Sequence, residues 1–227
     1  MTDHDIGATT PRRGFLRRLA AAAAMVGGSL ALPAPLAAAP TPDVADDDDW
    51  MKALTGKHRT VFDVGANRNG RPLIQSKNFL DAWRDAFKVP EQQVNLVFGV
   101  HGEAIPFVLS DALWSRFQIG QHFELTDPAT KAPATRNLFI ASNVATAGLV
   151  NAEQSVEALQ KRGVRFIVCR NALGATAARL SGLGLGPVEE VRAALLGDLL
   201  PGVIPVPAMV VAVAQLQERG LTYVKIA

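Results

Sequence analysis

From residue 59 onward, hydrophobic and polar positions alternate between the pattern of strands and the pattern of helices. Five short segments are apolar, carry β-branched residues and are bounded by turn residues, as β-strands are. They are residues 59–64, 93–100, 164–169, 202–206 and 221–226. The segment 93–100, QVNLVFGV, is almost continuously apolar, which is typical of a strand covered on both faces.

The segments between these strands have the apolar spacing of helices. In residues 76–89, SKNFLDAWRDAFKV, the side chains of Phe79, Leu80, Trp83 and Phe87 share one face, opposite charged residues. Further helices are predicted at residues 104–117, 152–163, 171–180, 186–200 and 207–220. Because strands that alternate with helices pair in parallel through right-handed crossovers, we predict the α/β class. The expected architecture is one three-layer α/β/α domain with a mainly parallel sheet of about five strands.

Residues 118–151 interrupt this rhythm, because they are polar and broken by Gly and Pro. We expect a long excursion between elements that serves as a lid or as an oligomer contact. Its side chains His122, Glu124 and Asp127 are of types that bind metals. Loops commonly carry such residues, so we predict no metal site here.

The N-terminus has the pattern of a twin-arginine secretion signal. Arg12 and Arg13 precede a mild, Ala-rich apolar stretch that ends in small residues. Glycines and prolines break this stretch, so it is a poor membrane span, and an uncleaved anchor is the weaker alternative. We predict a signal peptide at 1–39, an Asp-rich linker at 40–57 and the folded domain at 58–227. The mature protein is then periplasmic, exported folded, and has no membrane span.

Charge and cysteine content limit the classes of partner and of covalent cross-link that the protein can have. Removal of the signal's four Arg and two Asp leaves 19 basic and 19 acidic residues. A near-neutral chain with no basic stripe has little attraction for phosphate backbones, so we expect no nucleic-acid partner. Cys169 is the only cysteine, which excludes an intramolecular disulfide even in an oxidising compartment. It is therefore either a small buried residue or a reactive thiol.

Polar residues follow three of the predicted strands. They are Asn67, His101, Glu103, Cys169, Arg170 and Asn171. Ligands of open parallel sheets bind beyond the carboxyl ends of the strands, so we predict a site at this edge. Cys169 and His101 are the candidate catalytic residues, and the other four are candidate binding residues.

Two features favour a thiolate at Cys169. Arg170 places a cation next to it, and Asn171 is a good N-cap for the helix that follows. His101 could hold a proton near neutral pH. Each candidate also has a structural alternative. Cys169 could fill space at the end of a core strand, and His101 could bond to the backbone. Glu103 could lie in a first helical turn, where the helix dipole favours a carboxylate.

Four segments taken in order resemble the DsrE/DsrF-like family of the sulfur-relay fold. They are VFGVHGEAI, LQKRGVRFIVCRNAL, GVIPVPAMVVAVAQLQERGL and TYVKI. The resemblance covers the chain from about residue 59 onward, although residues 118–151 are longer than in the family. It implies a parallel α/β/α sheet, homo-oligomers that are often trimers or hexamers, and no tightly bound cofactor.

The resemblance also implies a function. In relatives that act in sulfur relay, a single cysteine accepts sulfane sulfur as a persulfide and passes it to a thiol of a protein partner. Cys169 matches the cysteine of the pattern C-x-N-x-L, so we expect a periplasmic sulfur carrier or sulfurtransferase-like protein. Two alternatives remain: a non-catalytic oligomeric binding or scaffold protein of the same fold, and a small-molecule sensor that uses Asn67, His101 and Asn171 as polar contacts.

Overall fold

The computed structural model describes residues 49–226 and is built on a five-stranded sheet. The strands are β1 (His58–Ala66), β2 (Val94–Glu103), β3 (Arg165–Cys169), β4 (Ile204–Val206) and β5 (Thr222–Ile226). Their order across the sheet is β4-β3-β2-β1-β5, and every neighbouring pair is parallel. All five predicted strands are therefore present, and the sheet places their carboxyl ends along one edge.

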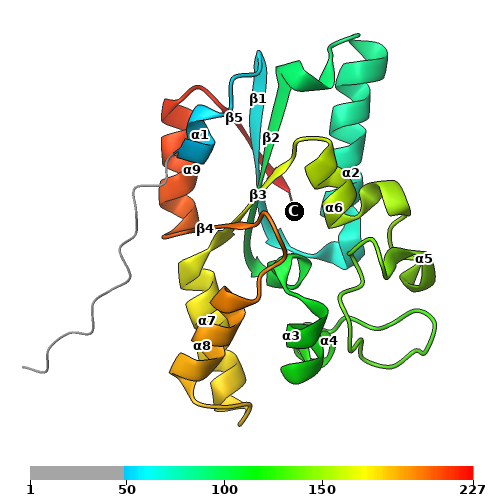
Figure 1. Cartoon of the computed structure of the whole chain (residues 1–227), viewed down its shortest axis with the longest axis vertical. Helices are drawn as coiled ribbons and strands as arrows, with labels where there is room; N and C mark the ends of the chain where they lie inside the picture. Colours follow the sequence, from blue (N-terminus) through cyan, green and yellow to red (C-terminus); the bar gives the residue numbers. More distant parts are fainter. Residues whose placement is uncertain (1–48, 227) are drawn as a thin grey trace, which may run out of the picture. The chain divides into compact units, whose positions relative to one another are not determined.

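Helices cover both faces of the sheet, so the predicted three-layer α/β/α fold is confirmed. Figure 1 shows α1 and α9 on one side of the strands and α2 and α6 on the other. The α-helices are α1 (Asp49–Lys52), α2 (Arg71–Asp81), α3 (Asp111–Arg116), α4 (Ile119–His122), α5 (Val144–Ala147), α6 (Val156–Lys161), α7 (Arg170–Gly182), α8 (Val188–Gly197) and α9 (Met209–Glu218). Short 3-10 or π turns are η2 (Arg68–Gly70), η3 (Ala82–Ala86), η4 (Glu91–Gln93), η5 (Ile105–Val108) and η6 (Ala152–Gln154). Within residues 49–226, no helix has the length and apolar character that a bilayer crossing needs.

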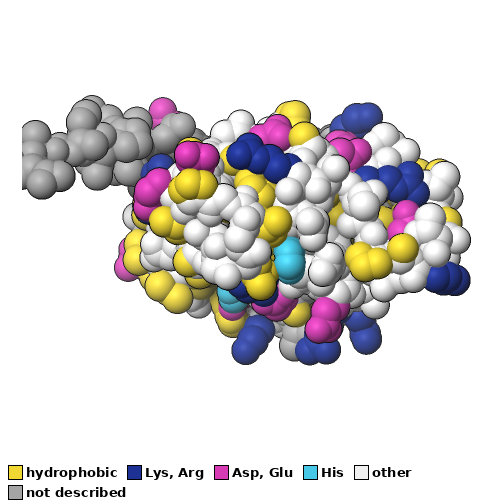
Figure 2. Space-filling view, turned by 90° about the horizontal axis from the view of Figure 1, so that it is seen from below, with side chains coloured by type: hydrophobic (Ala, Val, Ile, Leu, Met, Phe, Trp, Pro, Cys, Tyr) yellow, Lys and Arg dark blue, Asp and Glu magenta, His cyan; other side chains and the backbone are white. Residues whose placement is uncertain are grey.

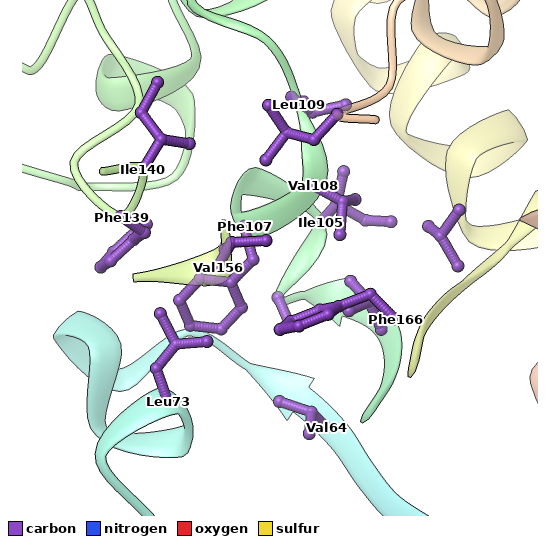
Figure 3. Packing of buried hydrophobic residues seen from close by; sticks show 14 of the residues in the cluster. Val64, Leu73, Ile105, Phe107, Val108, Leu109, Phe139, Ile140, Val156 and Phe166 are labelled. Carbon is purple, nitrogen blue, oxygen red and sulfur yellow. The ribbon is translucent and has the colours of Figure 1, made fainter. Parts of the chain in front are cut away.

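Two hydrophobic cores lie on opposite faces of the sheet. Successive side chains of a strand point to opposite faces, so Phe62 and Phe166 enter the larger core while Val61 and Ile167 enter the smaller one under α9. In the larger core the rings of Phe107 and Phe139 pack edge to face at 4.7 Å. Figure 3 shows these two rings among the side chains of this core, which include Leu73, Val156 and Phe166.

The smaller core reaches back into the segment that the sequence assigns to a linker. Met51 on α1 and Leu54 are both buried against this core. Within the described part of the predicted 40–57 linker, Met51 and Leu54 thus pack on the domain. The predicted signal peptide at 1–39 and residues 40–48 lie outside the described residues.

The single helix predicted at 104–117 is wrong. The chain forms the short turn η5, becomes extended at Leu109 and starts α3 at Asp111. Leu109 is extended because it forms an antiparallel bridge with Leu199, and the Ser110 side chain accepts a hydrogen bond from Leu113 N to cap α3. A tertiary contact therefore divides a segment whose apolar spacing alone favours one helix.

The excursion at 118–151 has little regular structure, as predicted, but it is part of the core. The side chains of Phe123, Leu125, Leu138 and Phe139 are buried in it. Fully buried Asn137 donates side-chain hydrogen bonds to the carbonyls of Pro106, Phe107 and Leu109. This packing is that of an integral part of the domain.

Candidate functional site

Strand alternation gathers four polar side chains on the face of the sheet that α9 covers. On β1, Asp63 shares the parity of the buried Val61. On β2, His101 shares the parity of Val97, and on β3, Cys169 shares the parity of Ile167. On β5, Tyr223 pairs with Val61 and so points to the same side. Sidedness alone therefore brings Asp63, His101, Cys169 and Tyr223 toward one region.

The ends of β2 and β3 bring His101 and Cys169 to one edge of the sheet. The parallel ladder between these strands ends with the pair of Val100 and Val168. The next residues on the two strands are His101 and Cys169, and both line one cavity. The His101 ring contacts β1, where its Nε2 lies 2.8 Å from Asp63 Oδ1.

These side chains line an open cavity of about 450 Å³. Its lining consists of Asp63, His101, Cys169, Asn171, Ala172, Ala208, Met209, Val210, Val213 and Tyr223. Half of these residues are aliphatic or methionine and come from the starts of α7 and α9. Figure 2, a view from below, shows hydrophobic side chains interspersed with charged and histidine side chains on this face. A largely apolar cavity with a few convergent polar groups is the usual form of a small-molecule site.

The sulfur of Cys169 lies at the N-termini of two helices. Its Sγ accepts hydrogen bonds from the backbone N–H of Ala172 in α7 and of Met209 in α9. The distance from nitrogen to sulfur is 3.4 Å in both. Both residues lie in the first turn of their helices, where N–H groups have no acceptor inside the helix. Two such donors stabilise negative charge on the sulfur. Only 7% of Cys169 is exposed, so the cavity is the way by which a reactant reaches it.

Asp63 holds the two other polar side chains. One carboxylate oxygen, Oδ1, is 2.8 Å from His101 Nε2, and the other, Oδ2, accepts a 2.8 Å hydrogen bond from the Tyr223 hydroxyl. The hydrogen bond to Asp63, followed by burial and by the charge of Asp63, raises the pKa of Tyr223 above its ordinary value of 10.0. Tyr223 is therefore a neutral hydroxyl over the whole physiological range.

Two glycines let these groups approach each other. A Cβ on Gly65 would lie 3.0 Å from Cε1 of the His101 ring, and a Cβ on Gly99 would lie 2.8 Å from Sδ of Met209. Gly99 is on β2, directly under the start of α9. The absence of side chains at these positions allows α9 to come close enough for Met209 N–H to reach the sulfur.

The predicted binding residues divide between this cavity and another. Asn171 lines the cavity that contains Cys169. Asn67 and Glu103 instead line a neighbouring open cavity of about 540 Å³, where Asn67 donates a 3.0 Å hydrogen bond to the Glu103 carbonyl. Arg170 is half-buried at the first position of α7 and does not line the cavity of Cys169.

The predicted cap of α7 is wrong. Asn171 is the second residue of the helix, and Cys169 itself is the N-cap, with extended backbone and its sulfur bonded to Ala172 N–H. The helix starts directly after the last residue of β3, which leaves no space for a separate capping residue. The helix dipole therefore acts on Cys169 at closer range than the sequence suggested.

Asp63 and Tyr223 are the functional side chains that the sequence reading missed. Asp63 interrupts the apolar strand VFDV at a position that faces α9, and a carboxylate at such a position needs a partner. The sequence therefore contained an indication that Asp63 has a polar partner. Tyr223 lies on the edge strand β5, whose exposed pattern gives no such indication. Within residues 49–226, no three His, Cys, Asp or Glu side chains are placed to hold a metal ion.

Comparisons with known proteins add little to this picture. No protein-family model matches the chain, and no curated protein matches it. The solved structure of MTH1491, a protein of unknown function from Methanobacterium thermoautotrophicum, is similar at 19% identity and a TM-score of 0.40, covering 74% of this chain and 99% of that one. A likeness at this level says nothing about chemistry, which depends on the side chains of the site.

Proposed function

We propose that the protein is a sulfur carrier or sulfurtransferase-like protein of the DsrE/DsrF-like type, with Cys169 as the persulfide acceptor. The observation that carries this proposal is the pair of N–H groups, from Ala172 and Met209, that point at a sulfur lining an open cavity. A cysteine that only fills space needs neither the donors nor the opening. A nucleophilic thiolate needs both.

The transfer step conserves atoms and electrons. The thiolate of Cys169 attacks the sulfane sulfur of a donor persulfide, a new S–S bond forms, and the donor's S–S bond breaks with its electron pair left on the departing thiolate. The persulfide of Cys169 then gives its outer sulfur to a partner's thiolate by the same exchange. His101, held by Asp63 through Nε2, lines the same cavity, so its Nδ1 is the acceptor for the proton of a thiol that enters there.

Location and assembly belong to the same proposal. With a cleaved signal at 1–39, the carrier acts in the periplasm and is exported after folding, so that sulfur can be loaded before or after export. It works as a homo-oligomer, a trimer or hexamer, with a thiol-bearing protein partner and no cofactor. Exposed apolar side chains on α9 and β5, among them Val210, Val211 and Val224, support an assembly surface.

The proposal is tested by intact-protein mass spectrometry after incubation of the native protein with polysulfide. We expect a gain of about one sulfur mass, ~32 Da, that a reductant reverses and that Cys169→Ser lacks. Because Cys169 is the only cysteine, the added sulfur is assigned to it without peptide mapping. A native protein that gains no sulfur, while the unfolded chain does, would end the sulfur-carrier proposal.

A second function, small-molecule binding without chemistry, is favoured by the apolar walls of the cavity. Val210, Val213 and Met209 give it more apolar than polar lining, as in many ligand sites. Such a protein binds its ligand equally well when Cys169 is replaced by Ser. A ligand-dependent rise in melting temperature that survives this substitution, together with no sulfur loading, would select this function.

A further inference from the structure

Three cavities adjoin along one side of α7. The cavity that contains Cys169 shares Ala172 with a second cavity of about 260 Å³. The second cavity shares Glu103 and Arg179 with the third, of about 540 Å³, which Asn67 also lines. We call these three cavities together the α7 groove. It runs from the thiol at the start of the helix to an ionic cluster near its end.

The middle of the α7 groove is lined by small side chains. Ala172, Ala175 and Thr176 of α7 leave space where larger residues would fill it. Arg179 follows Cys169 by ten residues, which is about 15 Å along a helix at ~1.5 Å per residue. Because helical side chains lean toward the N-terminus, the guanidinium lies closer to the sulfur than that. A ligand of two to three residues, ~7–11 Å when extended, spans the remaining distance.

The far end of the α7 groove carries charges of both signs. Arg68 and Arg179 are the cations, and Glu103 and Glu124 are the anions. The Arg179 guanidinium lies 3.3 Å from a Glu103 oxygen and 4.2 Å from the centre of the Phe123 ring, which hold it over the cavity. A ligand with only one sign of charge meets repulsion here. A ligand with both a carboxylate and an ammonium group finds a partner for each.

From this arrangement we infer that the small sulfur donor or acceptor is a low-molecular-weight peptide thiol with carboxylate and ammonium groups, bound along the α7 groove with its sulfur at Cys169. The inference rests on the proposed function, because it names the substrate class of the same thiol. In the persulfide form of this ligand, the Cys169 thiolate takes the outer sulfur. The S–S bond of the ligand breaks, and its thiolate leaves with the electron pair.

Binding is tested without sulfur transfer by S-methylglutathione, a tripeptide whose sulfur is blocked. Its dissociation constant is measured by calorimetry for the native protein, Cys169→Ser, Arg179→Ala and Arg192→Ala. Arg192 is the matched control, because it is exposed on α8 and lines none of the three cavities. We expect equal affinity in the native protein and Arg192→Ala, while Cys169→Ser reports what the thiol itself contributes to binding. Arg179→Ala should bind about tenfold or more weakly, as the loss of a charged hydrogen bond predicts.

A second ligand keeps the test valid if Arg179→Ala does not fold. The diethyl ester of S-methylglutathione retains the ammonium group but has no carboxylate, and we expect the native protein to bind it about tenfold or more weakly than the acid. Equal binding of acid and ester, or no binding of either, would overturn the inference. If polysulfide still loads Cys169 in that case, the sulfur-carrier proposal survives alone. If the tripeptide binds as expected but no sulfur is loaded, the α7 groove stands and the carrier proposal fails.

Discussion

At the residue scale, Asp63 determines how His101 works. Asp63 Oδ1 lies 2.8 Å from Nε2 of the ring, and an ionised carboxylate only accepts hydrogen bonds. Nε2 therefore carries the proton in the neutral ring, and Nδ1 is the acceptor. An Asp that fixes the tautomer of a histidine is a recurring arrangement in thiol and hydroxyl chemistry, and here the histidine lines the cavity of Cys169.

The same carboxylate predicts a measurable titration. Tyr223 is the only tyrosine in the chain, so ultraviolet absorbance near the phenolate band reports it alone. The pKa of Tyr223 is raised because its hydroxyl donates to Asp63. We expect Asp63→Asn to lower this pKa toward the ordinary value of 10.0, while Asp85→Asn, which changes an exposed carboxylate on η3, leaves it unchanged.

The sign of the linked stability follows from the direction of this shift. The folded state holds the Tyr223 proton more tightly than the unfolded state does, so the contribution is fully present below the unfolded pKa near 10. It is lost as pH rises through the higher folded value. A Tyr223 pKa at or below 10 in the native protein would contradict the hydrogen bond to Asp63.

Gly99 offers a second test at this scale. A Cβ there meets Met209 Sδ at 2.8 Å and the Phe62 carbonyl at 3.2 Å, so we expect Gly99→Ala to destabilise the fold by about 1–3 kcal/mol. It should also move α9 and slow the reaction of the thiol. The matched control is Gly174→Ala in α7, where a Cβ meets nothing within 4 Å. That change should stabilise by about 0.5–1 kcal/mol.

Denaturant unfolding and the rate of Cys169 alkylation, measured on both glycine variants, check this prediction. Equal stabilities for the two variants would show that α9 does not approach β2 as closely as Met209 requires. A destabilised Gly99→Ala protein with an unchanged alkylation rate would separate the packing of α9 from the reactivity of the sulfur.

The residues of the site were accessible to sequence reasoning to different degrees. Cys169 and His101 end apolar strands, and strand ends of a parallel sheet meet at one edge, so their proximity follows from local pattern. Arg170 does not line the cavity of Cys169, so its predicted role as a binding residue stays a prediction. Tyr223 could not be found, because its hydrogen bond to Asp63 joins residues that are 160 positions apart in the sequence.

At the scale of elements, long-range contacts decide where the sequence reading fails. The five strands are recognisable because each is a short segment with β-branched or apolar residues, bounded by turn residues. The division of residues 104–117 into two elements cannot be recognised in the same way. It depends on the bridge from Leu109 to Leu199 and on Asn137, which lies outside that segment. Apolar spacing contains no information about such partners.

Asn137 is the residue that tests the excursion at 118–151. Its side chain is fully buried, donates to three carbonyls and accepts from Phe139 N–H. We expect Asn137→Ala to destabilise the protein by about 2–4 kcal/mol, because it leaves several buried polar groups unpaired. Thermal or denaturant unfolding measures this loss. A change below about 0.5 kcal/mol, the size of an ordinary surface substitution, would mean that the excursion is not anchored as described.

At the scale of the whole molecule, exposed apolar side chains of β5 and α9 lie near the site. Strand β5 is an edge strand, and its residues Tyr223 and Val224 are 41% and 39% exposed. Val210 and Val211 of α9 are also exposed. Edge strands with apolar side chains tend to pair or to be covered.

We therefore predict self-association through this edge. Light scattering coupled to size-exclusion chromatography should give a mass of more than one chain, and Val211→Glu should shift it toward a single chain. The control is Leu183→Glu, a change of an exposed apolar residue just after α7, which should leave the mass unaltered. A single-chain mass for the unchanged protein would refute the homo-oligomer.

The measurement that tests the central claim most directly is the alkylation of Cys169 by iodoacetamide in the native protein near neutral pH, followed by intact mass. Cys169 is 7% exposed yet lines an open cavity, and its sulfur accepts hydrogen bonds from two N–H groups. We predict complete modification of the folded protein, at a rate at least equal to that of the unfolded chain, and none in Cys169→Ser. Modification only after unfolding would show that Cys169 is a buried core residue and would contradict a functional thiol.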